Sequence, residues 1–404
     1  MTTKPDIKIL LLENVHPVAT EAFNAAGFHV ENVKGSISED ELVARVRDVQ
    51  VVGLRSKTRI TPRVLDNAKN LLSVGAFCIG TNQIATTHAN TCGIPVFNAP
   101  FSNTRSVAEL IMAEVVMLAR QLGDRSREVH DGVWKKVADG CHEIRGKTIG
   151  IIGYGHIGSQ IGVLAEAFGM RVVFFDIVAK MAMGNNQALR KLDDVLAVSD
   201  FVTLHVPETP QTKNMIGPEQ IAKMKPGACL LNASRGTVVV IEALADAIRR
   251  GHVSGAAVDV YPEEPASNSS GFNSALRGLP NVILTPHIGG STEEAQEAIG
   301  REVSAALIKY INSGATTGAV NFPQIELPLD TSSHRILNVH KNVPGVLRDI
   351  NKIVSDFNAN IRAQTLATDP DIGYLLMDLE QDVSQDVSRA IGALPTSIKT
   401  RILL

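Results

Sequence analysis

The chain is poor in cysteine and in aromatic residues, and neither sign of charge dominates. Its 404 residues include four cysteines, one tryptophan and 4% aromatic residues. The cysteines have no CxxC spacing and no histidine in ligand register, so neither a disulfide framework nor a metal site is expected. They are better explained as buried small apolar residues of a cytoplasmic protein. These four residues are Cys78, Cys92, Cys141 and Cys229.

The charge balance and the length of the apolar runs exclude two further classes of partner. Lysine and arginine number 39 against 42 for aspartate and glutamate, which gives a net charge of −3. This balance predicts no nucleic-acid partner and no binding to an anionic membrane surface. No segment approaches the roughly 20 consecutive apolar residues of a membrane span. An apolar fraction of 44% over this length predicts two or three globular domains.

Residues 145–176, RGKTIGIIGYGHIGSQIGVLAEAFGMRVVFFD, have the order of elements that a dinucleotide site requires. Gly153, Gly155 and Gly158 give the spacing GxGxxG after an apolar strand at 148–152. The first glycine permits a tight turn, the second a close approach of pyrophosphate, and the third close packing of helix on strand. The phosphates are expected at the N-terminus of a helix that begins with His156 and Ile157. GxGxxG alone is weak evidence, but the flanking strands and the terminal acid favour a nucleotide site over a simple glycine-rich turn.

Asp176 indicates which dinucleotide this turn binds. It lies 18 residues after Gly158, at the end of a second apolar strand, where a carboxylate binds both hydroxyls of an adenosine ribose. A 2′-phosphate would be repelled there, and Ile177 and Val178 offer no arginine to receive it. NAD is therefore predicted over NADP, with Lys180 as the one nearby cation.

The rest of the chain predicts an α/β fold with three domains. Alternating strands and helices in the first hundred residues predict a parallel sheet, and the segment 104–129 predicts one long helix that leaves this lobe. A helix at about 292–311 is expected to return the chain, because two connections between lobes are a common way to close a cleft on substrate. From residue 335 the pattern becomes β-α-β-β-α-β, a ferredoxin-like unit. The predicted domains are 1–102 with 290–328 for substrate, 103–289 for NAD in a Rossmann fold, and 332–404 for regulation.

Three charged residues follow predicted strands of the nucleotide lobe, at the sheet edge where ligands gather. They are Arg235 in LLNASRG, Glu264 in AAVDVYPEEP and His287 in LTPHIGG. Oxidation of a secondary alcohol needs a base near neutral pH, which histidine provides, and a guanidinium binds a substrate carboxylate with two parallel hydrogen bonds. Taken singly, each residue is better explained without a catalytic role: Arg235 as a surface ion pair, Glu264 as a solvated loop acid and His287 as a capping residue. Together, in the same sheet as the nucleotide turn, they predict an active site.

The chain resembles the D-isomer-specific 2-hydroxyacid dehydrogenases, in particular those members that act on 3-phosphoglycerate and carry a C-terminal ACT regulatory domain. The resemblance extends over nearly the whole length, in the strings FCIGTNQ (77–83), VFNAPFSNTRSVAEL (96–110), GIIGYGHIG (150–158), NASRGTVV (232–239) and LTPHIGGST (284–292). It implies that His287 is the acid/base, Glu264 its partner and Arg235 the substrate anchor. It also places Asp259 among the NAD-binding residues. The implied reaction is reversible oxidation of 3-phospho-D-glycerate to 3-phosphohydroxypyruvate, the first step of L-serine biosynthesis, with 2-oxoglutarate as a further keto-acid substrate.

The segment LRSKT at 54–58 bears on the identity of the substrate. Arg55, Ser56 and Lys57 offer two cations and a hydroxyl at a strand end, a cradle for phosphate or, with equal weight from sequence alone, a solvated strand end. The resemblance implies that these residues bind the phosphate of the substrate and that Asn103 also lines the site. It maps a contact from a neighbouring subunit onto Trp134 and Lys136, although packing is the simpler role for Trp134.

The C-terminal unit resembles serine-binding ACT domains, with His340, Asn342 and Asn360 as the implied effector residues. Turn chemistry explains the same polar residues without a ligand. The resemblance implies that serine is a feedback inhibitor, and a homotetramer is the expected assembly. Two other functions stay open, namely a dehydrogenase of another D-2-hydroxy acid and a non-catalytic NADH-sensing interaction protein. One departure from the resemblance is Val240, which replaces an acid at the expected start of a helix.

Overall fold

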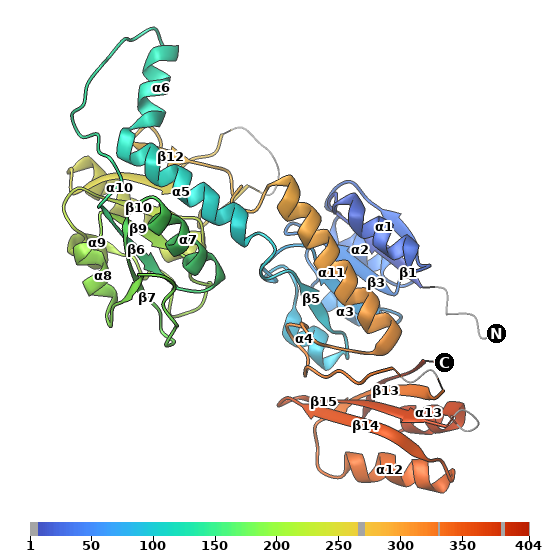
Figure 1. Cartoon of the computed structure of the whole chain (residues 1–404). Coiled ribbons are helices and arrows are strands. Elements are labelled where there is room, and N and C mark those ends of the chain that lie inside the picture. Colours follow the sequence, from blue (N-terminus) through green and yellow to red (C-terminus); the bar gives the residue numbers. More distant parts are fainter. Residues whose placement is uncertain (1–6, 266–270, 330–331, 381–383, 404) are drawn as a thin grey trace. The chain divides into compact units, whose positions relative to one another are not determined.

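The computed structural model describes residues 7–265, 271–329, 332–380 and 384–403. Contacts divide the chain into two units, of which the first combines Met1–Ser102 with Gln296–Leu404 and the second is Asn103–Ala295 (Figure 1). The first unit thus contains both chain ends and the second is one continuous segment. Among the described residues, none of the helices is both long enough and apolar enough to cross a membrane.

The N-terminal part of the first unit is a five-stranded parallel sheet of order β2-β1-β3-β4-β5. Its strands are β1 (Lys8–Leu11), β2 (His29–Asn32), β3 (Val51–Leu54), β4 (Ser73–Ala76) and β5 (Val96–Asn98). The helices between them are α1 (Pro17–Ala25), α2 (Glu39–Arg45), α3 (Pro62–Asn67) and α4 (Thr86–Thr91). Strands β3 and β4 are buried at every residue, as expected for a parallel sheet that is covered on both faces.

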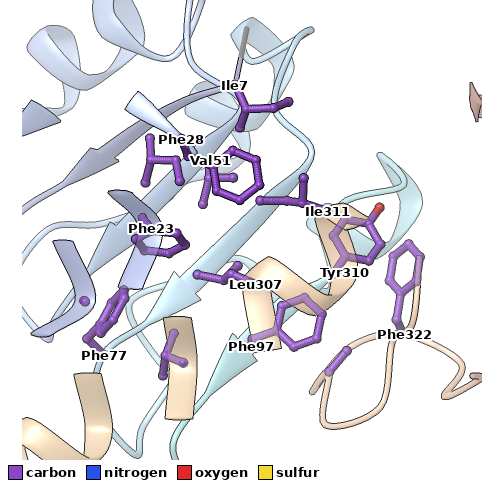
Figure 2. Close-up of a cluster of buried hydrophobic side chains, with 14 of the residues drawn as sticks. Ile7, Phe23, Phe28, Val51, Phe77, Phe97, Leu307, Tyr310, Ile311 and Phe322 are labelled. Atoms are coloured by element: carbon purple, nitrogen blue, oxygen red, sulfur yellow. The ribbon is translucent and has the colours of Figure 1, made fainter. Parts of the chain in front are cut away.

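Helix α11 (Glu293–Ser313) returns the chain to this sheet, as predicted. Leu307, Tyr310 and Ile311 of α11 join the apolar cluster that contains Phe23 and Phe97 of the sheet lobe (Figure 2). The helix lies so close to β4 that a Cβ on Gly75 would lie 2.7 Å from a methyl carbon of Leu307. Apolar contact with this helix therefore ties two distant segments of the chain into one core.

The second unit is built on a seven-stranded parallel sheet of order β12-β11-β10-β9-β6-β7-β8. Its strands are β6 (Thr148–Ile152), β7 (Arg171–Phe175), β8 (Gln187–Ala188), β9 (Phe201–Leu204), β10 (Ala228–Asn232), β11 (Val253–Val258) and β12 (Val282–Leu284). Its helices are α5 (Thr104–Arg120), α6 (Leu122–His130), α7 (His156–Ala167), α8 (Leu192–Val198), α9 (Pro218–Lys223), α10 (Ile241–Arg249) and the 3-10 turn η1 (Gly236–Val238). Two apolar clusters pack around this sheet.

The prediction of one continuous helix over 104–129 is wrong. Helix α5 ends at Arg120. Its C-cap, Gln121, has a left-handed φ of 50°, and α6 begins at the next residue. Eight residues of α5 are buried, whereas α6 has no buried residue. The buried apolar face of α5 ends at this break. Beyond it, no contact with the core keeps the chain in the direction of α5.

The C-terminal segment forms the predicted ferredoxin-like unit, a four-stranded antiparallel sheet of order β14-β15-β13-β16. Its elements are β13 (His334–Lys341), α12 (Val346–Asp356), β14 (Ile361–Thr368), β15 (Ile372–Leu379), α13 (Ser384–Gly392) and β16 (Ser397–Leu403). Every residue of β15 is buried because its side chains alternate between two cores. Tyr374 and Leu376 join the core that includes α11, while Leu375 and Met377 pack with α12 and α13.

A buried arginine, Arg335, forms an ion pair within this sheet and also binds the end of α11 and the segment that follows it. Arg335 of β13 donates two hydrogen bonds to the carboxylate of Asp378 in β15, at 2.7 and 2.8 Å, and both side chains are at most 3% exposed. The same guanidinium donates to the carbonyl oxygen of Ser313 at the end of α11, and to those of Leu327 and Pro328. A charge removed from water is tolerable only when it is paired and hydrogen-bonded in this way.

Candidate active site

The glycine turn between β6 and α7 has the geometry that its spacing predicts. Gly153 has a φ of 91°, and a Cβ there would collide with the carbonyl oxygen of His205. A Cβ on Gly158 would collide with the carbonyl oxygen of Gly153. The helix and the strand therefore pack this closely only with glycine at position 158. Gly155, by contrast, is the N-cap of α7 and a Cβ there would meet no atom. The space beside Gly155, just before His156 and Ile157 of α7, therefore leaves room for a pyrophosphate.

Asp176 lies at the end of β7 and is fixed to this turn. Its carboxylate accepts hydrogen bonds from the backbone N–H groups of Tyr154, at 2.8 Å, and Val178, at 2.9 Å. Tyr154 is buried, stacks on Phe174 at 3.7 Å between ring centroids, and accepts a hydrogen bond from Asn186 Nδ2 at 2.6 Å. The acid that would bind the ribose is therefore held rigidly relative to the glycine turn. The contribution of Tyr154 was not foreseen, since the motif leaves its second position open.

His287 and Glu264 form the pair that the sequence predicted. Nδ1 of His287 lies 2.8 Å from Oε2 and 3.1 Å from Oε1 of Glu264. The hydrogen bond to Glu264 raises the pKa of His287 against the opposing effect of burial. Burial would raise the pKa of Glu264, but the hydrogen bond and the charge of His287 outweigh it and lower that pKa. The carboxylate therefore stays ionised and stabilises the imidazolium.

Asp259 shapes the loop that carries His287. Its buried carboxylate accepts hydrogen bonds from Thr285 Oγ1 at 2.6 Å and from the N–H groups of Ile288 and Gly289 at 2.8 Å each. The backbone carbonyl of Asp259 accepts the N–H of His287 at 2.8 Å. These bonds hold His287 at a φ of 55°, a left-handed conformation that is uncommon for histidine. The role of Asp259 toward the cofactor stays a prediction, whereas its support of the catalytic loop is a feature that the sequence did not reveal.

Arg235 lies in the loop after β10, close enough for its charge to act on both members of the pair. That charge lowers the pKa of Glu264 and of His287, each as a minor effect. Asn232 stabilises the loop, because its Oδ1 accepts from Ser234 N–H and Oγ and its Nδ2 donates to the carbonyl of Arg235. The loops after β10, β11 and β12 thus bring a guanidinium, a carboxylate and an imidazole to one edge of the sheet.

Burial strongly shifts the pKa of further groups in this unit, among them His205 and Glu114. Desolvation lowers the pKa of His205, at the end of β9, to about 3, so this ring stays neutral. Burial, followed by the charge of Asp259, raises the pKa of Glu114 on α5 to about 8. His287 therefore differs from His205 in having a carboxylate partner.

Asn103 and Trp134 belong to the second unit, but the structure gives them no shared contact with the catalytic pair. Asn103 is the N-cap of α5, and its Oδ1 is buried with no hydrogen-bond partner among the described residues. Trp134 is 83% exposed and Lys136 is exposed too. The expectation that Trp134 packs within its own chain is wrong, because the whole stretch 131–140 after α6 is exposed.

In the first unit, Arg55, Ser56 and Lys57 share one loop at the carboxyl end of β3. Glu13 fixes this loop, since its buried carboxylate accepts the backbone N–H groups of Lys57 at 3.0 Å and Thr58 at 2.6 Å. Gln83 Nε2 donates to the carbonyl of Arg55 at 2.6 Å. Neither anchor was singled out in the sequence. Both anchors bind only the backbone of the loop, in which Ser56 and Lys57 are exposed and Arg55 is half-buried.

The three predicted effector residues do not meet within one chain. His340 is buried at 3% exposure and its Nδ1 lies 2.9 Å from Asn338 Oδ1, while Asn342 Nδ2 donates to the carbonyl of Asp369 at 2.6 Å. Asn360 Nδ2 donates to Glu380 Oε1 at 3.3 Å. In the register of β15, His340 is opposite Gly373, whereas Ile361, next to Asn360, is opposite Leu379. Six strand residues separate these positions, which is about 20 Å at 3.3 Å per residue.

Comparison with known proteins agrees with this geometry. Residues 112–289 match the NAD-binding domain of D-isomer-specific 2-hydroxyacid dehydrogenases, and residues 336–399 match an ACT domain like that of the acetohydroxyacid synthase (AHAS) small subunit. The chain is 55% identical to D-3-phosphoglycerate dehydrogenase of Dictyostelium discoideum over 99% of its length and 98% of the relative. It is 51% identical to the Escherichia coli K12 enzyme of the same name, with the same two coverages. D-lactate dehydrogenase of Aquifex aeolicus, solved with NAD and lactic acid, superposes with a TM-score of 0.68 at 26% identity, covering 78% of this chain and all of that one.

The chain therefore belongs to the D-isomer-specific 2-hydroxyacid dehydrogenases. Its curated relatives in that family include D-3-phosphoglycerate dehydrogenases at 51–55% identity, and the chain is an NAD-dependent oxidoreductase. The predictions of family, fold class and cofactor are confirmed. The open backbone at Gly155 and the anchored Asp176 fit NAD, so these residues of the chain would hold its pyrophosphate and its adenosine ribose.

Proposed function

We propose that the chain oxidises 3-phospho-D-glycerate to 3-phosphohydroxypyruvate, the first step of L-serine biosynthesis. The observation that carries this proposal is the hydrogen-bonded pair His287–Glu264 beside Arg235, in the same sheet as the nucleotide turn. The printed names of the curated relatives specify the same substrate for those proteins.

The catalytic residues divide the reaction between them. NAD, when bound, accepts the hydride from the carbon that bears the hydroxyl. His287 takes the hydroxyl proton as general base, and the carbonyl group forms as the C–H and O–H bonds break. Glu264 offsets the positive charge that His287 then carries. Arg235 binds the carboxylate next to the reacting carbon with a planar pair of donors. Because the imidazolium can return its proton, the same residues serve the reduction of a keto acid, with 2-oxoglutarate as a further substrate.

The phosphate end of the substrate is assigned to Arg55, Ser56 and Lys57. Their loop offers two cations and a hydroxyl, and Glu13 and Gln83 hold its backbone in place. A hydroxy acid without a distal phosphate would leave these cations without a partner. The proposal therefore favours a phosphorylated substrate over other D-2-hydroxy acids.

One assay tests this function against both alternatives. NADH is followed by absorbance after the purified chain is mixed with NAD and either 3-phosphoglycerate or D-lactate. The proposal expects turnover with the first substrate and at most a trace with the second. Turnover with D-lactate alone would establish another D-2-hydroxyacid dehydrogenase, and NADH binding without turnover would establish a sensor protein. Arg55→Ala should raise the KM for 3-phosphoglycerate more than it changes kcat.

We also infer that L-serine inhibits the enzyme at an interface between two C-terminal domains of a homotetramer. Support comes from the ACT match and from the separation of about 20 Å between His340 and Asn360 in one chain, so that one small ligand cannot touch both. In the sheet, β14 has β15 as its neighbour and forms an edge. Such an edge can pair with its copy, and a two-fold axis then brings the loop after β13 of one chain to the start of β14 of the other.

A further inference from the structure

Helices α3 and α4 of the first unit bring three metal-binding types of side chain together, away from the loop of Arg55. Asp66 lies in α3, His88 lies in α4, and Cys92 is the C-cap of α4. One ligand atom from each residue lies within 4.8 Å of the other two. It is the one such group of three found among the described residues. The expectation that no cysteine has a histidine in ligand register is therefore wrong.

The helix itself places two of the ligands. The N–H of Cys92 donates to the carbonyl of His88 at 3.0 Å, so the two residues are one helical turn apart on the same face. Asp66 reaches them from the neighbouring helix, and its Oδ1 lies 2.7 Å from Nε2 of His88. The His88 side chain is 34% exposed and that of Asp66 is 61% exposed. The two helices thus place a half-buried imidazole and a half-buried thiol next to an exposed carboxylate whose side chain can rotate.

We propose that Asp66, His88 and Cys92 bind a Zn²⁺ ion, with water completing a tetrahedral site. Zinc binds sulfur at about 2.3 Å and nitrogen or oxygen at about 2.0–2.2 Å, which sets its ligands about 3.3–3.8 Å apart. The contact between Asp66 and His88 must open from 2.7 Å, and separations of up to 4.8 Å must close by about 1 Å. Rotation of the exposed Asp66 side chain and of the imidazole supplies such movements without a shift of either helix. A thiolate with an imidazole selects zinc over magnesium and calcium, which prefer oxygen ligands.

Such an ion would link α3 to a helix that contacts the C-terminal domain. Asn90 of α4 donates from Nδ2 to Asp369 Oδ2 and to the carbonyl of Asn321, each at 2.7 Å. An ion that binds the folded chain and not the unfolded one raises its stability in proportion to the logarithm of the ion concentration over Kd. Zn²⁺ should therefore raise the melting temperature of the full-length chain.

The test uses full-length protein that has been treated with a chelator and dialysed, titrated first with Co²⁺ as a coloured probe and then with Zn²⁺ in competition. The proposal expects one ion per chain, a thiolate-to-Co²⁺ charge-transfer band, and no effect of millimolar Mg²⁺. Cys92→Ser should abolish the band, and His88→Ala and Asp66→Asn should each weaken Zn²⁺ binding at least 10-fold. Cys141→Ser, which removes a free thiol of the second unit, is the matched control and should change nothing.

Activity and melting temperature show whether each variant has folded. All four variants should keep turnover with NAD and 3-phosphoglycerate, since none of these residues is placed in the catalytic machinery. Zn²⁺ should raise the melting temperature of the wild type and of Cys141→Ser, but not that of Cys92→Ser or His88→Ala. The proposal is overturned if the wild type shows no thiolate band, or if His88→Ala and Cys92→Ser bind Zn²⁺ as tightly as the wild type. In that case the Asp66–His88 contact is only a hydrogen bond between two helices.

Discussion

The second unit and the C-terminal domain both contain a histidine near the end of a strand, but the two histidines differ in burial and in partners. His287 is half exposed, and only its Nδ1 has a partner among the described residues, the carboxylate of Glu264. His340 is buried, bonds to Asn338, and lies so close to Gly373 that a Cβ there would collide with the ring. The first histidine has a nitrogen available to a substrate, whereas the second is part of the sheet.

This difference teaches how each site is completed. In the second unit, three loops at one sheet edge supply the guanidinium, the carboxylate and the imidazole from one chain. In the C-terminal domain, the predicted effector residues lie at opposite ends of the sheet. The proposed catalytic set thus comes from strand ends of one chain, whereas the proposed effector site requires residues of two chains.

The largest effect should come from removing the base of the second unit. We expect His287→Ala to lower the rate of oxidation about 10²–10⁴-fold, because general-base catalysis contributes that much. NADH binding, measured by fluorescence, should persist, since the glycine turn is untouched. His142→Ala, which removes an exposed histidine of the same unit, should keep full activity. Near wild-type turnover of His287→Ala would require a different base.

The matching test of the C-terminal domain uses mixed oligomers. Asn342→Ala and Asn360→Ala should each lower inhibition by serine while leaving uninhibited turnover intact, because these residues are far in sequence from the catalytic loops. A hybrid of the two variants should regain part of the inhibition. One of its two interface sites then combines the intact Asn342 of one chain with the intact Asn360 of the other. Hybrids as insensitive as the single variants would place the effector site within one chain.

A smaller effect is expected on the pH dependence of catalysis. Glu264 raises the pKa of His287, so Glu264→Gln should lower that pKa. Oxidation needs the neutral imidazole and rises as pH increases through this pKa. The rise in kcat/KM should therefore move to lower pH in the variant, while Glu263→Gln leaves it in place. An unchanged profile in Glu264→Gln would show that the carboxylate does not act on His287.

The smallest effect concerns the stability of the second unit. Val240 is the N-cap of α10, and it supplies no side-chain hydrogen bond. Val240→Asp should raise the free energy of unfolding by about 1 kcal/mol, because a carboxylate at this position accepts an N–H of the first turn. Val239→Asp, one residue earlier and 1% exposed, should instead destabilise by burying a charge. Denaturant titration measures both changes, and catalysis should be unaffected by Val240→Asp.

Prediction from sequence succeeded where the physical signal is local. Three features were placed correctly: the strand at 148–152, the turn at Gly153 and the start of α7 at His156. Each depends on residues that are close in sequence, namely an apolar run and the spacing of three glycines. The order of strands and helices in the C-terminal domain followed from periodicity in the same way. The break at Gln121 was missed because no glycine or proline lies in 104–122 and Gly123 follows only after the break. The end of the buried face shows where α5 stops.

The sequence by itself determined the class of fold and the cofactor, and it predicted the catalytic residues, since motif spacing and chemical type lie within short segments. Only the tertiary structure decided what supports them. Asp259 under the loop of His287, Glu13 under the loop of Lys57, and Asp66 beside His88 are contacts between segments that are distant along the chain. No local pattern encodes such a contact, because it exists only after the strands have paired and the apolar cores have closed.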